Sequence, residues 1–207
     1  MFSRSYLDWN ATAPMRAEAR AALSSALEAA GNPSSVHSEG RAARKLVEDA
    51  RTQLAHTIGA RVDAIVFTSG GTEANAQALT PGWSLSGRAC TRLIVSAIEH
   101  PSVLAGGRFA PADVSHAPVT RDGVLDLDKL RALLRAGGPA LVSLMLANNE
   151  TGALQPVPEA ARIVHEGGGV LHVDAVQALG RVPLNAAELG ADPVSYTHLT
   201  LPTNREV

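Results

Sequence analysis

The chain has 207 residues, of which 45% are hydrophobic and 18% charged, and its formal net charge is -2. This length allows one sizeable core or most of one large domain, and the near-neutral charge excludes the basic surface typical of proteins that bind nucleic acid or anionic membranes. No run approaches the roughly 20 apolar residues of a membrane span, and the N-terminal MFSRSYLDWN has no apolar signal core, so we expect a cytoplasmic protein.

The first third of the sequence predicts an extended segment followed by two helices. Tyr6–Pro14 reads as extended and ends in a turn, and the alanine-rich Arg16–Ala30 predicts a helix. Gly31–Ser35 breaks that helix. Gly40–Ile58 then shows the pattern of an amphipathic helix, with an apolar face made of Leu46, Val47, Ala50, Leu54, Thr57 and Ile58.

From Ala64 onward, short apolar runs alternate with helical segments. The runs that we expect to form strands are Ala64–Thr68, Arg92–Ile98, Val114–Val119, Leu141–Leu146 and Val170–Val173. The segments that we expect to form helices are Glu73–Leu79, His100–Ala105, Asp126–Arg135 with Asp126 as its cap, and Pro158–Glu166. Apolar runs without alternation, separated by helices, predict an α/β fold with a mainly parallel sheet sandwiched by helices.

The segment Ser69–Asn75, SGGTEAN, follows the first predicted strand and opens a helix. Ligands bind beyond the carboxyl ends of the strands in sheets of this kind. Gly70 and Gly71 permit unusual dihedrals and a close approach of the backbone, and the amides of Gly71, Thr72 and Glu73 would suit a phosphate. An ordinary strand-to-helix turn capped by Thr72 is the alternative.

Three later strand ends carry further polar residues. His100, at a predicted helix start, is placed to lie flat over an aromatic ligand, although taken alone this position favours capping the helix or facing solvent. Asn148 and Asn149 offer amides at a pocket mouth or simply form a turn. Asp174 ends an apolar run, so its carboxylate needs a partner such as a protonated ring nitrogen, unless it caps a helix. Gln177 could return to the same ligand.

Taken together, a phosphate cradle, a stacking histidine, an amide and an acid at successive strand ends are what a protein needs to hold pyridoxal phosphate. The blocks that contain these residues also carry a specific resemblance. In order they are YLDWNATAP, GNPSSVHSEGR, IVFTSGGTEAN, VSAIEHPSVL, LVSLMLANNETG, QPV and GGVLHVDAVQALG. They resemble the ordered blocks of the cysteine desulfurases, within the class V aminotransferases, from about Tyr6 to Val194.

The resemblance implies a fold-type I large domain, a homodimer, and release of sulfur from L-cysteine as an enzyme persulfide that leaves L-alanine. The sulfur would pass to an acceptor or scaffold protein for iron–sulfur cluster assembly or tRNA thiolation. It also implies a role for each candidate residue. Gly71 and Thr72 would bind the cofactor phosphate, and His100 would stack on the cofactor ring and transfer protons. Asp174 would pair with the ring nitrogen, Gln177 would contact the phenolic oxygen, and Asn149 would contact the ring and the substrate. Asn10, Ala11 and Thr12 would line the substrate side.

The sequence departs from this pattern after Val194. Leu199 stands where the resemblance expects the Schiff-base lysine, and the two lysines of the chain, Lys45 and Lys129, fit no such place. Cys90, the single cysteine, matches no persulfide-forming motif and excludes a multi-cysteine metal site built from this chain, so no metal is expected. We therefore expect an N-terminal segment at 1–15, an incomplete large domain at 16–195, a foreign tail at 196–207, and a chain that is inactive alone.

Two other interpretations stay open. One is another class V enzyme, such as a selenocysteine lyase or a small-molecule aminotransferase. The other is a non-catalytic truncated paralogue that binds an intact desulfurase subunit. A dinucleotide-binding domain is disfavoured, because that fold has an early G-x-G-x-x-G followed about 20 residues later by an acid, and the sequence has no such arrangement.

Overall fold

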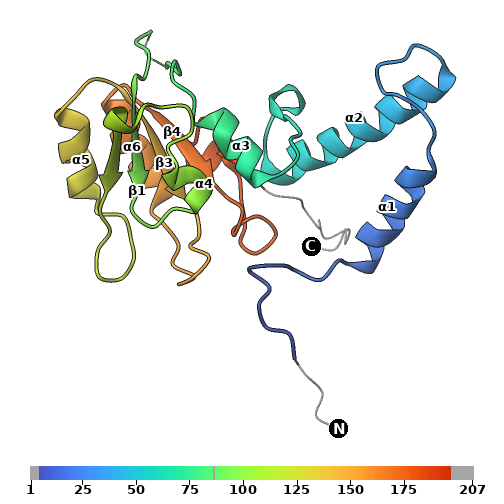
Figure 1. Ribbon diagram of the computed structural model, residues 1–207, viewed down its shortest axis with the longest axis horizontal. Coiled ribbons are helices and arrows are strands. Elements are labelled where there is room, and N and C mark those ends of the chain that lie inside the picture. The colour runs from blue at the N-terminus through green and yellow to red at the C-terminus, as the bar shows by residue number, and fades with distance from the viewer. Residues whose placement is uncertain (1–4, 86, 197–207) are drawn as a thin grey trace. The chain divides into compact units, whose positions relative to one another are not determined.

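The computed structural model describes residues 5–85 and 87–196 of the chain (Figure 1). The chain divides into two compact units, and we describe each by itself. The described part of the first unit is 5–65, and that of the second is 66–85 with 87–196. None of the helices traced between residues 5 and 196 combines the length and the apolar character that crossing a bilayer demands.

The first unit contains the two predicted helices, α1 (Ala17–Glu28) and α2 (Ser38–Ile58), and a short 3-10 turn, η1 (Val62–Ala64). The side chain of His37 caps α2 by accepting a hydrogen bond from the Gly40 amide, and Gly59 ends the helix in the left-handed conformation at φ 64°. Of the six residues predicted to form the apolar face, only Ile58 is buried in this unit. Burial occurs instead near the two ends of α2, where the loop before it and η1 pack.

The strand predicted at Ala64–Thr68 is wrong. Ala64 belongs to η1, and the residues after it form no strand; the side chain of Val66 is 72% exposed. A strand exists only where a neighbouring strand pairs with its backbone amides and carbonyls. The sheet in the described residues offers this segment no such neighbour.

The second unit is built on a five-stranded sheet in which every neighbouring pair is parallel, as the alternating pattern predicts. Its order is β2-β1-β3-β4-β5, with β1 at Arg92–Ser96, β2 at Val114–Ala117, β3 at Ala140–Met145, β4 at Val170–Asp174 and β5 at Val194–Ser195. The helical elements are α3 (Gly71–Ala78), α4 (Pro101–Leu104), η2 (Pro111–Asp113), α5 (Leu127–Arg135), α6 (Val157–Glu166) and α7 (Ala186–Leu189). Asp126 caps α5 as predicted, whereas α7 and β5 were not among the predicted elements.

The two faces of this sheet are covered by different helices (Figure 1). Successive side chains of a strand point to opposite faces. Ile94, Val142, Leu144, Leu171 and Val173 pack with α5 and α6 in the larger core cluster. The alternate residues Leu93, Val95, Leu141 and Val170 pack with Val103 of α4 and with Leu79, which follows α3. The polar residues of β3 and β4 therefore lie on the face that α3 and α4 cover.

Candidate functional site

The register of the three last strands brings buried polar side chains together on that face. Ser143 of β3 lies beside His172 of β4, and Asp174 at the end of β4 lies beside Ser195 of β5. Ser143, His172 and Ser195 are at most 3% exposed and Asp174 is 5% exposed. His172 contacts both serine hydroxyls, Ser143 Oγ at 2.8 Å from Nδ1 and Ser195 Oγ at 3.0 Å from Nε2. Burial lowers the pKa of His172 to about 4, so this ring is neutral at physiological pH.

Asn75 of α3 joins this cluster to the acid. Its Nδ2 donates to Asp174 Oδ2 at 2.9 Å, and its Oδ1 accepts from the hydroxyl of Ser195. The second oxygen of Asp174, Oδ1, accepts from the Val176 amide at 3.0 Å. The Asp174 carboxylate is thus held from two sides. The helix-capping role considered for it is not found, because the described residues that follow Asp174 form a turn and no helix begins there.

His100 connects to the same network from α4. Its Nδ1 lies 2.7 Å from Ser102 Oγ and accepts the Ser102 amide hydrogen at 3.2 Å, which makes His100 the N-cap of α4. Ser102 Oγ in turn accepts from Asn75 Nδ2 at 2.9 Å. The predicted site residues His100 and Asp174 are therefore linked through only two side chains, although His100 itself is exposed.

The start of α3 carries the residues expected to bind a phosphate. Gly70 is the N-cap and has no side chain to satisfy the first amides of the helix, which have no intrahelical partner. A Cβ on Gly70 would meet no atom within 4 Å, so the space beside this residue is open. The φ of Gly70 is 168°, which is ordinary extended backbone, so the unusual dihedrals predicted for it are not found. Glu73 turns back and accepts from the amide and hydroxyl of Ser69, which lowers the pKa of its carboxyl.

The amides Asn148 and Asn149 behave differently from one another. Asn148 is buried, and its Oδ1 accepts from Glu150 N, Thr151 N and Thr151 Oγ1, so it forms the turn. Asn149 is half-buried and donates to Glu150 Oε1. Gln177 lies in the turn after β4, which the Leu179 amide closes onto Ala175, and Gln177 accepts from Arg181. The roles of Asn149 and Gln177 stay predictions.

Asn10, Ala11 and Thr12 belong to the first unit and are exposed there. They form a turn in which the carboxylate and carbonyl of Asp8 accept from the amides of Ala11 and Thr12. Their substrate-lining role stays a prediction. Of the segment 196–207 predicted to be foreign, only Tyr196 is described; 197–207, with Leu199, lie outside the described residues.

Sequence reasoning missed Asn75, Ser102 and His172 as parts of the site. Asn75 carried a signal, because asparagine is unfavourable in a helix interior unless its side chain has a specific partner. It also missed Glu99, which is 5% exposed and accepts from Ser96 Oγ at 2.6 Å through Oε1. Burial raises the pKa of Glu99 to about 8, and within the described residues its Oε2 has no hydrogen-bond partner.

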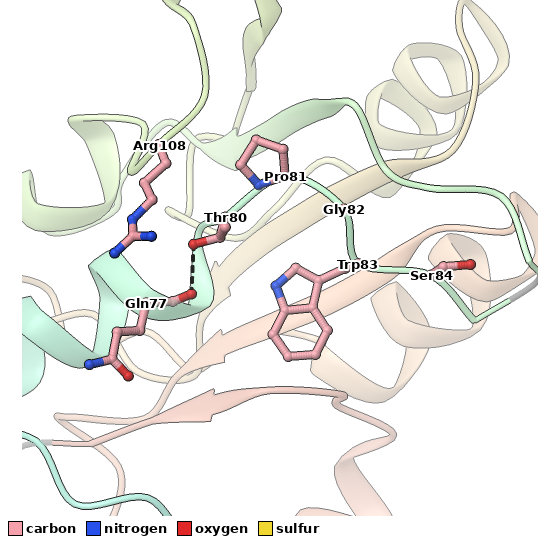
Figure 2. Close-up of a pocket in the computed structure, with 7 residues that line it drawn as sticks. All are labelled: Gln77, Thr80, Pro81, Gly82, Trp83, Ser84 and Arg108. Carbon is pink, nitrogen blue, oxygen red and sulfur yellow. Dashed lines mark hydrogen bonds between the residues drawn. The ribbon is translucent and has the colours of Figure 1, made fainter.

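An open groove of about 560 Å³ lies at the other end of α3 (Figure 2). It is lined by Gln77, Thr80, Pro81, Gly82, Trp83, Ser84 and Arg108. None of the residues predicted to bind the cofactor lines it. The groove is therefore separate from the predicted site, and the indole nitrogen of Trp83 in it is bonded to the Ala78 carbonyl at 2.8 Å.

The comparisons with known proteins agree with the geometry. Residues 5–197 match the family model described as Aminotransferase class-V. The chain is 42% identical over 197 residues to the cysteine desulfurase IscS of Dictyoglomus turgidum, and 43% identical over 187 residues to a cysteine desulfurase of Cereibacter sphaeroides. These alignments cover 93% and 87% of this chain but 50% and 48% of the relatives, so the chain spans about half the length of the curated relatives it matches.

Solved structures give the same result. A NifS-like protein from Rickettsia africae superposes with a TM-score of 0.83 at 34% identity, over 93% of this chain and 53% of that one. A structure described as SspA in complex with cysteine superposes with a TM-score of 0.80 at 26% identity, over 94% of this chain and 57% of that one. The parallel sheet with its helices is thus the fold of NifS-like proteins.

Proposed function

Because the chain belongs to the aminotransferase class-V family, we propose that its protein is a pyridoxal-phosphate-dependent cysteine desulfurase. In this reaction L-cysteine gives up its sulfur to the enzyme as a persulfide and leaves as L-alanine. The curated relatives named cysteine desulfurases support the assignment, as does the similarity to a protein solved with cysteine bound. The observation that carries it is the buried Asp174 carboxylate, held at a strand end and linked to His100 through Asn75 and Ser102.

The residues of the second unit fit pyridoxal phosphate. The space beside Gly70 at the start of α3 is open, which leaves room for a phosphate dianion at this helix N-terminus. Each oxygen of the Asp174 carboxylate already accepts one hydrogen bond and has a further lone pair for a ring nitrogen. Gly71 and Thr72 would hold the phosphate, and Asn149 and Gln177 would contact the ring. When bound, the cofactor supplies a protonated pyridine ring that withdraws electrons from the substrate.

The remaining chemistry falls to His100. Its Nδ1 accepts from the Ser102 amide, so only Nε2 is free to hold or release a proton toward a ligand. A proton at that atom suits an acid–base role next to the substrate. His100 is therefore the residue that we assign to proton transfer in the desulfurase reaction.

The partners and the location belong to the same proposal. They comprise a homodimer, a sulfur-acceptor or scaffold protein that takes the persulfide sulfur toward cluster assembly or tRNA thiolation, and a cytoplasmic setting. The homodimer and the acceptor protein are supported by the resemblance to cysteine desulfurases. Size measurement, affinity capture with known acceptors, and fractionation check the oligomeric state, the acceptor and the location in turn.

The experiment that tests the function has two parts. The 207-residue chain is titrated with pyridoxal phosphate by calorimetry, where saturable binding is expected. Protein expressed from the complete gene is then incubated with the cofactor, L-cysteine and a thiol reductant, and L-alanine and sulfide are measured in equal amounts. Alanine formed from selenocysteine but not from cysteine would favour a selenocysteine lyase. Binding without turnover of either amino acid would favour the non-catalytic paralogue.

A further inference from the structure

We propose that Asn75 is a positioning residue that orients both Asp174 and His100 through one hydrogen-bond chain of fixed direction. The chain runs from Ser143 through His172 and Ser195 to Asn75, and from there to Asp174 and, through Ser102, to His100. Its role toward the cofactor rests on the proposed function, whereas its direction follows from the contacts alone. Nothing in the family description or in the names of the relatives assigns a role to Asn75.

On the α4 side, the direction of the hydrogen bonds follows from two N–H groups that can only donate, the Ser102 backbone amide and Asn75 Nδ2. The Ser102 backbone amide can only donate, and it points at His100 Nδ1, so that nitrogen carries no proton in the neutral ring. The Ser102 hydroxyl must therefore donate to the same Nδ1 at 2.7 Å. Its oxygen is then left to accept the hydrogen of Asn75 Nδ2 at 2.9 Å.

The orientation of the Asn75 amide follows from its other neighbour. A carboxylate only accepts, so the atom that lies 2.9 Å from Asp174 Oδ2 has to be the amide nitrogen. Both hydrogens of Nδ2 are thereby assigned, one to Asp174 and one to Ser102. The Asn75 oxygen faces the Ser195 hydroxyl, and only that hydroxyl can supply the hydrogen between them.

The direction on the sheet side follows in turn. Because the Ser195 hydroxyl hydrogen goes to Asn75, the contact between Ser195 and His172 needs a hydrogen on His172 Nε2. The buried ring is neutral, so His172 Nδ1 accepts, and Ser143 donates to it. A reversed Asn75 amide would place its oxygen against the Asp174 carboxylate. Only one orientation of these groups therefore gives every donor in the hydrogen-bond chain an acceptor. Asn75, which is 1% exposed, is the residue at which the branches of this hydrogen-bond chain meet.

This arrangement has a chemical consequence at each end. Asp174 keeps a neutral donor on one oxygen, which holds the carboxylate in place for a cationic ring nitrogen without neutralising its charge. His100 is held with Nδ1 occupied, so that Nε2 is the nitrogen that exchanges protons. Asn75 itself contacts neither the substrate nor the cofactor in this scheme, and acts through these two side chains.

The test is ¹⁵N NMR of the histidine rings in the complete 207-residue chain at neutral pH. In the wild type we expect His100 and His172 both to show a protonated Nε2 and an unprotonated Nδ1. In Asn75→Asp, an oxygen of the new carboxylate replaces the amide nitrogen beside Ser102, and the Ser102 hydroxyl turns toward position 75. His100 Nδ1 then keeps only the Ser102 amide as a donor, so its ¹⁵N signal should move toward that of an unprotonated nitrogen with fewer hydrogen bonds. His172 should not change, because Ser195 can still donate to the new carboxylate.

A second variant gives the opposite pattern. Ser195→Ala removes the link between His172 and Asn75, so the His172 signals should show a mixture of tautomers while those of His100 stay as in the wild type. The matched control is Gln77→Glu, which makes the same amide-to-carboxylate change at an exposed position of α3 and should alter neither ring. Backbone amide spectra of each variant report whether it folds.

Three outcomes would overturn the proposal. They are a protonated Nδ1 on either ring of the folded wild type, an unchanged His100 in folded Asn75→Asp, and an unchanged His172 in folded Ser195→Ala. Asn75→Asp and Ser195→Ala are tested separately, so if one of them misfolds, the other still decides the proposal. If pyridoxal phosphate does not bind the wild type, the proposed function and the role of Asn75 in it are both wrong. That failure is distinct, because the ring signals are recorded without the cofactor.

Discussion

Glu99 Oε1 accepts a hydrogen bond from the backbone amide of Met145 at 2.7 Å, and Met145 is the strand neighbour of Asp174. A buried carboxyl group, that of Glu99, thus lies at the carboxyl ends of the strands, close to Asp174 of the candidate site. Burial is the main reason why the pKa of Glu99 rises to about 8, and the nearby charge of Asp174 adds to it.

The wild type should lose stability at mildly alkaline pH because Glu99 ionises there, and Glu99→Gln should not show this loss. The pKa of Glu99 rises from 4.5 to about 8 on folding, so its contribution is present below 4.5 and lost as the pH rises through 8. Between pH 6.5 and 8 the free energy of unfolding of the wild type should fall by about 2 kcal/mol. Urea denaturation across this range should give a flat profile for Glu99→Gln. A profile that still falls would contradict the assignment, and Glu159→Gln, at an exposed position, serves as the control.

His172 should produce the opposite slope at lower pH. Burial depresses its pKa from 6.5 to about 4, so stability is present above 6.5 and lost as the pH falls toward 4, by about 3 kcal/mol in total. In the wild type the Glu99 and His172 slopes should nearly cancel between 4.5 and 6.5. In Glu99→Gln the His172 slope should appear alone, and adding His172→Gln should abolish it. Adding the exposed His116→Gln instead should leave it intact.

Asp174→Asn should weaken the binding of pyridoxal phosphate by roughly 10- to 100-fold, because a hydrogen bond to a charged group contributes about 1.5–3 kcal/mol. The change keeps the size of the side chain and removes its charge. Calorimetric titration measures the dissociation constant. Asp126→Asn is the matched control, since asparagine caps a helix about as well as aspartate. Equal affinity for wild type and Asp174→Asn would remove Asp174 from the cofactor site.

Thr72→Val should act on the phosphate alone. It removes one hydroxyl donor at the start of α3 without changing the shape of the side chain, so binding of pyridoxal phosphate should weaken about 2- to 10-fold. Binding of pyridoxal, which lacks the phosphate, should be the same in both proteins. Thr80→Val, after the other end of α3, should change neither affinity. A loss of equal size for both ligands would place Thr72 away from the phosphate.

Gly107→Ala should destabilise the second unit by roughly 2–5 kcal/mol, since it combines a left-handed backbone with a clash. The φ of Gly107 is +58°, and a Cβ there would lie 2.3 Å from the Leu79 carbonyl oxygen. Gly152→Ala separates the two effects, because its φ is +72° but no atom lies within 4 Å of the added carbon. It should cost only about 1–2 kcal/mol in urea denaturation. Equal losses for both variants would rule out the clash.

The positions of the sheet strands were readable from the sequence wherever both faces of a strand are buried. The apolar runs at 92–98, 141–146 and 170–173 contain strands of this kind, because a parallel strand covered on both sides needs no polar alternation. The run at 114–119 contains the edge strand β2, in which His116 is exposed. Ala64–Thr68 has the same composition but forms no strand, because pairing partners, and not composition, complete a strand. The two-residue β5 is too short to give any pattern.

By itself the sequence determined the fold class, three of the four predicted strand ends at which polar residues gather, and the family whose blocks it shares, because these depend on local periodicity and on short motifs. Only the tertiary structure decided which polar side chains meet. Asn75 and Asp174 are 99 residues apart in the chain, and Asn75 and Ser195 are 120 apart, yet they form one buried network. Such contacts follow from strand register and helix packing, which no local pattern encodes, and burial then leaves each polar atom in need of a partner.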